Sequence, residues 1–238
     1  MERYFKNKKL LERNNVYSKE MEHDACGVGL VASTEGKKSR EVVEYGIQAL
    51  KAVWHRGAVD ADGKTGDGAG IHVEIPKEFF KEKIEVTGHV YDNSEICIGM
   101  IFLPRNNYEA QESCRTLVEK ELTQNDFNIY GWRQVPVNTK VLGEKAEQTR
   151  PEITQVLFRH NNQKLSGKSL EIKLYETRRK IENNVRQNHL DNFYICSFSS
   201  KSIIYKGMFL AEALADFYTD LADERFISRY AIFHQRFS

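Results

Sequence analysis

The sequence predicts one globular domain that combines α-helices with short β-strands, preceded by a polar leader. A chain of 238 residues with 40% hydrophobic and 29% charged side chains has the length and composition of a soluble domain with a sizeable core. Segments with apolar residues at helical spacing occur among short apolar runs bounded by glycine or proline, as in mixed folds. Residues 1–25 are polar without a sustained apolar period, so we assign 1–25 to the leader and 26–238 to the domain.

The first half of the chain contains three predicted strands and two predicted helices. Residues 26–32 are apolar and glycine-bearing, which predicts a buried strand. Ser39 is a typical helix N-cap, and apolar residues follow it at helical spacing, so we expect a helix that ends near Gly57. The elements expected next are a glycine-rich loop at 63–70, a strand at 71–75, a short helix beginning at Pro76 and a strand at 96–103.

The second half alternates amphipathic helices with further strands. We expect helices at 107–124 and 169–188 and strands at 129–135 and 153–159. The runs 193–199 and 203–207 resemble the two arms of a hairpin. A last apolar strand at 230–233 meets the end of the chain without a turn or a polar tail, so we expect an incomplete domain.

Charge and cysteine content exclude several classes of protein. A net charge of +1 gives no electrostatic basis for binding nucleic acid or an anionic membrane. No segment approaches the ~20 apolar residues of a membrane span, and no secretory signal is present. The four cysteines lack the spacing of zinc or redox motifs, so we expect free thiols in a reducing cytoplasm.

Cys26 is the first candidate for chemistry. Taken by itself, a cysteine beside a strand is more typical of a buried structural thiol. If the bond between Ala25 and Cys26 is cut, however, the new α-amine has a pKa of ~7.7–8.0 and can serve as a general base for the thiol. The thiolate could then attack a carboxamide carbon and expel ammonia.

Two other patterns in the glycine-rich region are interpreted as structural. Five residues separate Gly57 from Gly63, whereas a P-loop requires four at that point, and a strand follows instead of a helix. Asp60, Asp62 and Asp67 imitate part of a calcium loop, but a lysine stands at one ligand position and the final glutamate is absent. We therefore expect no metal site.

The remaining candidates are histidines and one arginine. His55, His72 and His234 share no ligand spacing, which favours packed or surface roles. Arg236 follows the last apolar run and fits either a surface position or a bidentate clamp for a carboxylate.

Together these segments resemble the amidotransferase domain of glutamate synthases, a class II glutamine amidotransferase of the N-terminal-nucleophile hydrolase group. The resemblance covers about residues 21–238 and rests on several separate motifs in the family's order. It is densest at residues 24–29, 55–71, 196–200, 205–208 and 233–238, which include Cys26-Gly27, His55-Arg56-Gly57 and Gln235-Arg236-Phe237-Ser238.

The resemblance implies an α+β fold, an αββα sandwich of two antiparallel sheets flanked by helices. It implies that Cys26 is the catalytic nucleophile, freed by removal of residues 1–25. Arg236 matches the arginine that binds the α-carboxylate of glutamine, and Arg56 matches an arginine close to the nucleophile. The implied reaction is hydrolysis of glutamine to glutamate and ammonia through a cysteine thioester, with the ammonia used to make glutamate from 2-oxoglutarate.

The resemblance also implies partners outside the 238 residues. FMN and an iron–sulfur cluster belong to downstream synthase domains of the same polypeptide, and a small electron-donating subunit can accompany them; no cofactor is expected in this chain. Asp60 stands where the family commonly has glycine. The family's oxyanion-hole residues come after Ser238, so we expect the chain alone to be weakly active.

Two alternatives remain open at this point. One is an amidotransferase of another biosynthetic enzyme, such as one for purine or amino-sugar synthesis, although the long insert between Gly70 and Cys196 argues against it. The other is a non-catalytic fragment or regulatory module with an incomplete site.

Overall fold

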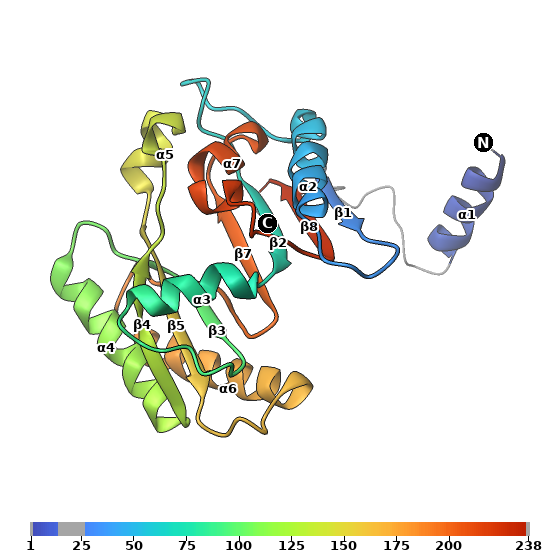
Figure 1. The fold of residues 1–238 in the computed structure, drawn as a ribbon. Coiled ribbons are helices and arrows are strands. Elements are labelled where there is room, and N and C mark those ends of the chain that lie inside the picture. The colour runs from blue at the N-terminus through green and yellow to red at the C-terminus, as the bar shows by residue number, and fades with distance from the viewer. Residues whose placement is uncertain (1, 14–26, 237–238) are drawn as a thin grey trace.

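The protein folds around two antiparallel four-stranded sheets with helices packed against them (Figure 1). The structure is a computed structural model and describes residues 2–13 and 27–236. The first sheet has the strand order β1 (Gly27–Ala32), β8 (Tyr230–Gln235), β2 (Ala69–Glu74) and β7 (Ser202–Gly207). The second sheet has the order β4 (Phe127–Gln134), β5 (Glu152–His160), β3 (Cys97–Leu103) and β6 (Tyr194–Ser199). The predicted α+β class with two antiparallel sheets flanked by helices is confirmed.

The predicted leader contains a helix that the sequence analysis did not foresee. Helix α1 spans Glu2–Arg13, and its Phe5 and Leu10 are exposed. The expected boundary between residues 25 and 26 lies outside the described residues. Among the helices of the described residues, none has the length and hydrophobicity that a bilayer crossing requires.

Helix α2 (Arg40–Ala52) packs on the first sheet, mainly against β8 (Figure 1). The Ser39 side chain accepts a hydrogen bond from Val42 N at 3.4 Å, which confirms the predicted N-cap. The helix ends earlier than expected and is followed by a 3₁₀ turn, η1 (Trp54–Arg56), that delivers the chain to Gly57. This turn places Gly57 beside the end of β8.

The second sheet is covered by α4 (Tyr108–Gln124) and α6 (Gly167–Gln187), close to the predicted ranges (Figure 1). Their apolar faces bury Leu122, Leu174 and Ile181 against that sheet in one cluster. Helix α3 (Lys77–Val86) begins after Pro76, as predicted, and belongs to a second cluster shared by both sheets. Short elements complete the described chain: η2 (Thr139–Val141), α5 (Glu144–Thr149), η3 (Ala211–Ala213), α7 (Leu214–Phe217) and η4 (Thr219–Ala222).

The hairpin expected at 193–199 and 203–207 is wrong. Strands form at both places, but β6 pairs with β3 and β7 pairs with β2, so the short connection crosses from one sheet to the other. The Glu171 carboxylate fixes this crossing by accepting hydrogen bonds from Ser199 Oγ at 2.9 Å and from Ser200 N at 2.8 Å. A partly buried carboxylate from α6 therefore holds the turn, in place of a backbone ladder between β6 and β7.

A buried ion pair joins the second sheet to the chain that precedes β8. The Arg133 guanidinium donates to both carboxylate oxygens of Asp220, at 2.7 and 2.6 Å. Tyr205 Oη donates to the same carboxylate at 3.0 Å, and Gln155 Nε2 donates to Tyr205 Oη at 3.1 Å. Strands from both sheets are thus connected through one satisfied polar network.

Candidate functional site

The candidate site lies where three strands of the first sheet meet. In the antiparallel register, Gln235 at the end of β8 lies opposite Gly27 at the start of β1 and opposite Ala69 at the start of β2. Gly27 directly follows Cys26 in the sequence, and Arg236 directly follows Gln235. Cys26 lies outside the described residues, so the site is described here from the residues around it.

Arg236 is held by two consecutive residues of the loop before β2. Its backbone N donates to Gly68 O at 2.7 Å, and its Nε lies 3.0 Å from Asp67 Oδ2. Its φ of +87° is in the left-handed region, which a non-glycine residue adopts only where its surroundings impose it. The Arg236 side chain remains 38% exposed, so it can reach a ligand from solvent.

Asp67 beside this arginine, and Gln235 before it in the sequence, carry buried polar atoms without hydrogen bonds among the described residues. Both carboxylate oxygens of Asp67 are covered from solvent, yet neither accepts a hydrogen bond from a described residue. The Nε of Arg236 is therefore at ion-pair distance from Asp67 without the alignment of a hydrogen bond. Gln235 is 1% exposed, and its amide nitrogen and oxygen also lack partners among the described residues. Such groups are rare in native structures and call for a partner such as a water, an ion or a ligand.

Gly57 forms one wall of this cluster. A Cβ atom at that position would lie 2.1 Å from Gln235 Nε2 and 3.2 Å from Asp67 Oδ1. Only glycine allows these two side chains to approach the backbone so closely. Arg56 is the last residue of η1, directly before Gly57, so its backbone borders the cluster. The structure describes only the backbone of Arg56.

The loop between Gly57 and β2 is pinned to α5. The Asp62 carboxylate accepts from Lys64 N at 2.9 Å, from Thr65 N at 2.7 Å and from Thr65 Oγ1 at 2.6 Å, and these bonds lower the pKa of Asp62 to about 2. Lys145 Nζ donates to Asp60 Oδ2 at 2.7 Å. The aspartates that imitate a calcium loop thus bind protein groups, and nowhere in residues 2–13 and 27–236 do three potential metal ligands gather.

The three cysteines that the structure describes are unsuited to nucleophilic attack. Cys97, Cys114 and Cys196 are buried and free, as predicted. Burial raises the pKa of Cys97 well above its usual value, that of Cys114 to about 11 and that of Cys196 to about 12. These thiols stay protonated near neutral pH, and a thiol attacks only as the thiolate.

Two of the candidate histidines, His72 and His234, lie on the other face of the first sheet from the Gln235 side chain. Side chains alternate along a strand, so His234 lies on the opposite face of the first sheet from Gln235. His72 on β2 lies on that same face, and burial lowers the pKa of both histidines. His55 is exposed within η1.

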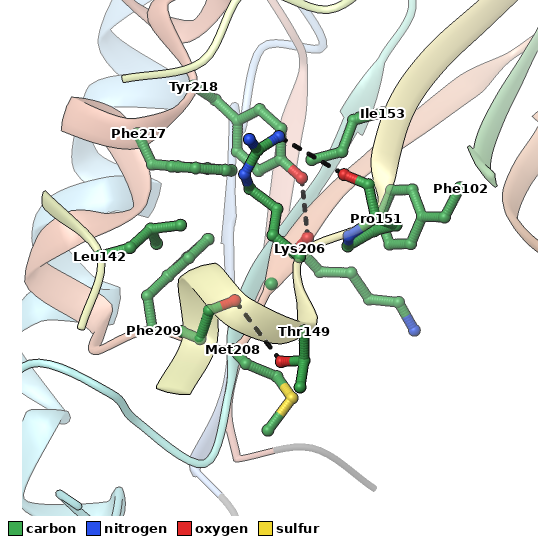
Figure 2. Close-up of a pocket in the computed structure, with 13 residues that line it drawn as sticks. Phe102, Leu142, Thr149, Pro151, Ile153, Lys206, Met208, Phe209, Phe217 and Tyr218 are labelled. Atoms are coloured by element: carbon green, nitrogen blue, oxygen red, sulfur yellow. Dashed lines mark hydrogen bonds between the residues drawn. The ribbon is translucent and has the colours of Figure 1, made fainter. Parts of the chain in front are cut away.

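An apolar pocket of about 180 Å³ is separate from the arginine cluster. Leu142, Phe209 and Phe217 line it (Figure 2). Arg236, Asp67 and Gln235 are not among its lining residues. Its polar groups bind the protein itself: Tyr218 Oη donates to Lys206 O at 2.8 Å, as Figure 2 shows. The pocket suits apolar groups and offers little to acid–base or nucleophilic chemistry.

Sequence reasoning found Arg236 but missed its neighbours. Asp67 was considered only as an imitation of a calcium ligand, and Gln235 and Gly57 were given no role of their own. Because strand register brings these residues together, their spacing in the sequence carried no signal of the contact.

Comparison with known proteins gives consistent results. The sequence model of the family described as "Glutamine amidotransferases class-II" matches residues 26–238. The chain is 57% identical over 224 residues to the "Glutamate synthase [NADPH] large chain" of Azospirillum brasilense, covering 94% of this chain and 15% of that protein.

More distant relatives carry similar names. The chain is 37% identical to the "Ferredoxin-dependent glutamate synthase" of Pyropia yezoensis, covering 97% of this chain and 15% of that protein. It is also 37% identical to the "Glutamate synthase [NADPH] large chain" of Bacillus subtilis, covering 94% and 14% respectively. The chain therefore spans about 15% of the length of the curated relatives it matches.

Proposed function

This chain belongs to the class II glutamine amidotransferases, and from that premise we propose that it hydrolyses glutamine as the amidotransferase part of a glutamate synthase. The observation that carries the proposal is Arg236, anchored at the end of β8 with its side chain partly exposed and its backbone in a strained conformation. A guanidinium in that setting is suited to the α-carboxylate of an amino acid, which it can bind with two parallel hydrogen bonds.

Cys26 is proposed as the nucleophile. Removal of residues 1–25 would free its α-amine, which takes the thiol proton while the sulfur adds to the carboxamide carbon of glutamine. The carbon–nitrogen bond then breaks, the proton passes to the leaving nitrogen, and ammonia departs from a thioester. Water hydrolyses the thioester to glutamate and restores the thiol.

Two features of the described residues support this assignment. The other three cysteines are buried with raised pKa values, which leaves Cys26 as the candidate thiol. The neighbour of Cys26, Gly27, pairs with the neighbour of Arg236, Gln235. The residues next to the proposed nucleophile and the proposed carboxylate clamp thus pair across adjacent strands. Arg56, which precedes Gly57 at the same cluster, is proposed as a second substrate-binding residue.

The rest of the proposal concerns the longer protein. Ammonia released here would be used in downstream domains to convert 2-oxoglutarate to glutamate, with FMN and an iron–sulfur cluster bound there. The three described cysteines do not fit such a cluster, because they lie buried in the core without forming a group of metal ligands. We further propose a cytoplasmic location and a small electron-donating subunit.

The test compares Cys26→Ala with the unaltered native protein. Glutamine-dependent glutamate formation should disappear in the variant, while formation from free ammonia continues. Retained glutaminase activity in the variant would overturn the assignment of the nucleophile.

Sequencing the N-terminus of the native protein tests the leader separately. The mature chain should begin at Cys26, and a chain that begins at Met1 would contradict the proposed α-amine base. The relatives reported above are glutamate synthases, so an amidotransferase of purine or amino-sugar synthesis gains no support from them.

A further inference from the structure

We propose that Asp67 is a positioning residue for Arg236: its carboxylate holds the guanidinium through Nε and directs Nη1 and Nη2 toward the α-carboxylate of the substrate. The inference rests on the proposed function and adds to it a residue with no counterpart in the sequence-based assignment. Asp67 is not proposed to touch the substrate.

The geometry of the guanidinium carries the first step. Its five N–H donors form a planar fork, and a carboxylate can bind either the Nε side or the edge formed by Nη1 and Nη2. Asp67 Oδ2 lies 3.0 Å from Nε. Within residues 2–13 and 27–236, no second carboxylate pairs with Arg236, which leaves the edge formed by Nη1 and Nη2 without another ion-pair partner among those residues.

The surroundings of Asp67 carry the second step. Both of its carboxylate oxygens are covered from solvent and accept no hydrogen bond from the described residues. A covered carboxylate is unfavourable without a countercharge, and Arg236 supplies the one ion pair that Asp67 makes among those residues. Asp67 therefore favours side-chain conformations of Arg236 that keep Nε close.

The backbone carries the third step. Gly68, next to Asp67, accepts the hydrogen bond from Arg236 N at 2.7 Å. Two consecutive loop residues thus fix the main chain and the side chain of one arginine. The loop is itself fixed to α5, where Thr65 Oγ1 accepts from Ala146 N at 3.3 Å. The arginine is consequently pre-organised, which lowers the cost of ordering it when a ligand binds.

The experiment measures glutaminase kinetics of the native protein and of Asp67→Asn. The substitution keeps the shape of the side chain and removes its charge. We expect KM for glutamine to rise about tenfold while kcat stays within about threefold, because ground-state binding of the α-carboxylate is weakened. The same assay with glutamine α-amide, which lacks that carboxylate, should show a much smaller difference between the two proteins.

Asp60→Asn is the matched control, since it makes the same chemical change in the same loop at a residue that contacts Lys145 and not Arg236. Its KM should equal that of the unaltered protein. Asp67→Glu restores the charge on a longer side chain and should give an intermediate KM, which also keeps the test valid if Asp67→Asn folds poorly.

Three outcomes would overturn the inference. An unchanged KM in Asp67→Asn would show that Arg236 needs no help, and a lower KM would show that Asp67 competes with the substrate for the guanidinium. An equal loss with glutamine and its α-amide would indicate a general structural defect. In all three cases, glutaminase activity in the unaltered protein and in Asp60→Asn would still support the proposed function. If both proteins lacked glutaminase activity, the proposed function and the inference would both be overturned.

Discussion

Two of the arginine–carboxylate pairs among the described residues, Arg133–Asp220 and Arg236–Asp67, differ in how many of their hydrogen-bonding groups are used. In the pair between the sheets, Arg133 and Asp220 share two hydrogen bonds, and their side chains are 14% and 3% exposed. At the end of β8, Arg236 and Asp67 make one ion contact through Nε, and their side chains are 38% and 24% exposed. Arg133 and Asp220 satisfy each other without a ligand, whereas Arg236 keeps N–H donors that form no hydrogen bond with the described residues.

This difference separates a structural ion pair from a binding one. A buried pair with all its groups satisfied fixes one arrangement of the elements around it, and the loss of one partner leaves an uncompensated charge. A pair whose arginine is partly exposed contributes less to stability, because water reaches the guanidinium even though the Asp67 oxygens are covered. Its unused donors are what a negatively charged ligand can bind. Substitutions in the two pairs should therefore affect stability and activity in opposite proportions.

Asp220→Ala should have the largest effect on stability. We expect the free energy of unfolding to fall by about 3–5 kcal/mol, because Arg133 stays buried without its countercharge and Tyr205 loses its acceptor. Denaturant unfolding measures the loss, and hydrogen exchange in β4, β5 and β7 shows which strands are affected. A double variant, Arg133→Met with Asp220→Leu, should recover part of it. A loss below about 1 kcal/mol is the value expected of a surface ion pair and would contradict a structural role for Arg133–Asp220.

Arg236→Ala should show the reverse pattern. Stability should fall by less than in Asp220→Ala, because the Arg236 side chain is 38% exposed, although the covered Asp67 carboxylate loses its countercharge. The kcat/KM for glutamine should fall about 100-fold, as expected for the loss of charge-assisted hydrogen bonds to a carboxylate. Arg236→Lys keeps the charge but not the fork and should recover only a minor part of the activity. Near-normal kcat/KM in Arg236→Ala would remove this residue from the binding site.

Gly57→Ala should have the smallest effect on stability and on activity. It tests whether a small shift of Asp67 is enough to weaken its hold on Arg236. The added methyl group would force the buried Gln235 amide and the Asp67 carboxylate to shift, at a cost of about 1 kcal/mol in stability. We expect KM for glutamine to rise a few-fold with little change in kcat, since the displaced Asp67 holds Arg236 less well. Thermal unfolding and steady-state kinetics measure the two effects, and an unaltered KM would show that the cluster tolerates the shift.

Local patterns in the sequence were sufficient for most elements of the fold and insufficient for their pairing. Ser39 capped its helix as expected, and the helices at 107–124 and 169–188 formed near their predicted limits. The expected hairpin failed because the ladder partners of β6 and β7 come from distant parts of the chain, and the Glu171 carboxylate supports the turn between them. Periodicity reports which face of a strand is buried and not which strand lies beside it.

The candidate site was likewise predictable where a local motif marks a residue and unpredictable where strand pairing brings distant residues together. Arg236 could be proposed from a motif, and the structure places it beside the start of β1, but the role of Cys26 stays a prediction because it lies outside the described residues. Asp67 could not be found in this way. Its partner is far away in the sequence, and only the common register of β2 and β8 brings the two together.

The position of β8 has a consequence for biosynthesis. β1 pairs only with β8 within the described chain, and one edge of β2 also pairs with β8, although β8 is the last of these strands to leave the ribosome. Such high contact order slows folding. Until residues 230–235 emerge, the nascent polypeptide presents two unpaired edges, which makes it a client for chaperones and a risk for aggregation if translation stalls.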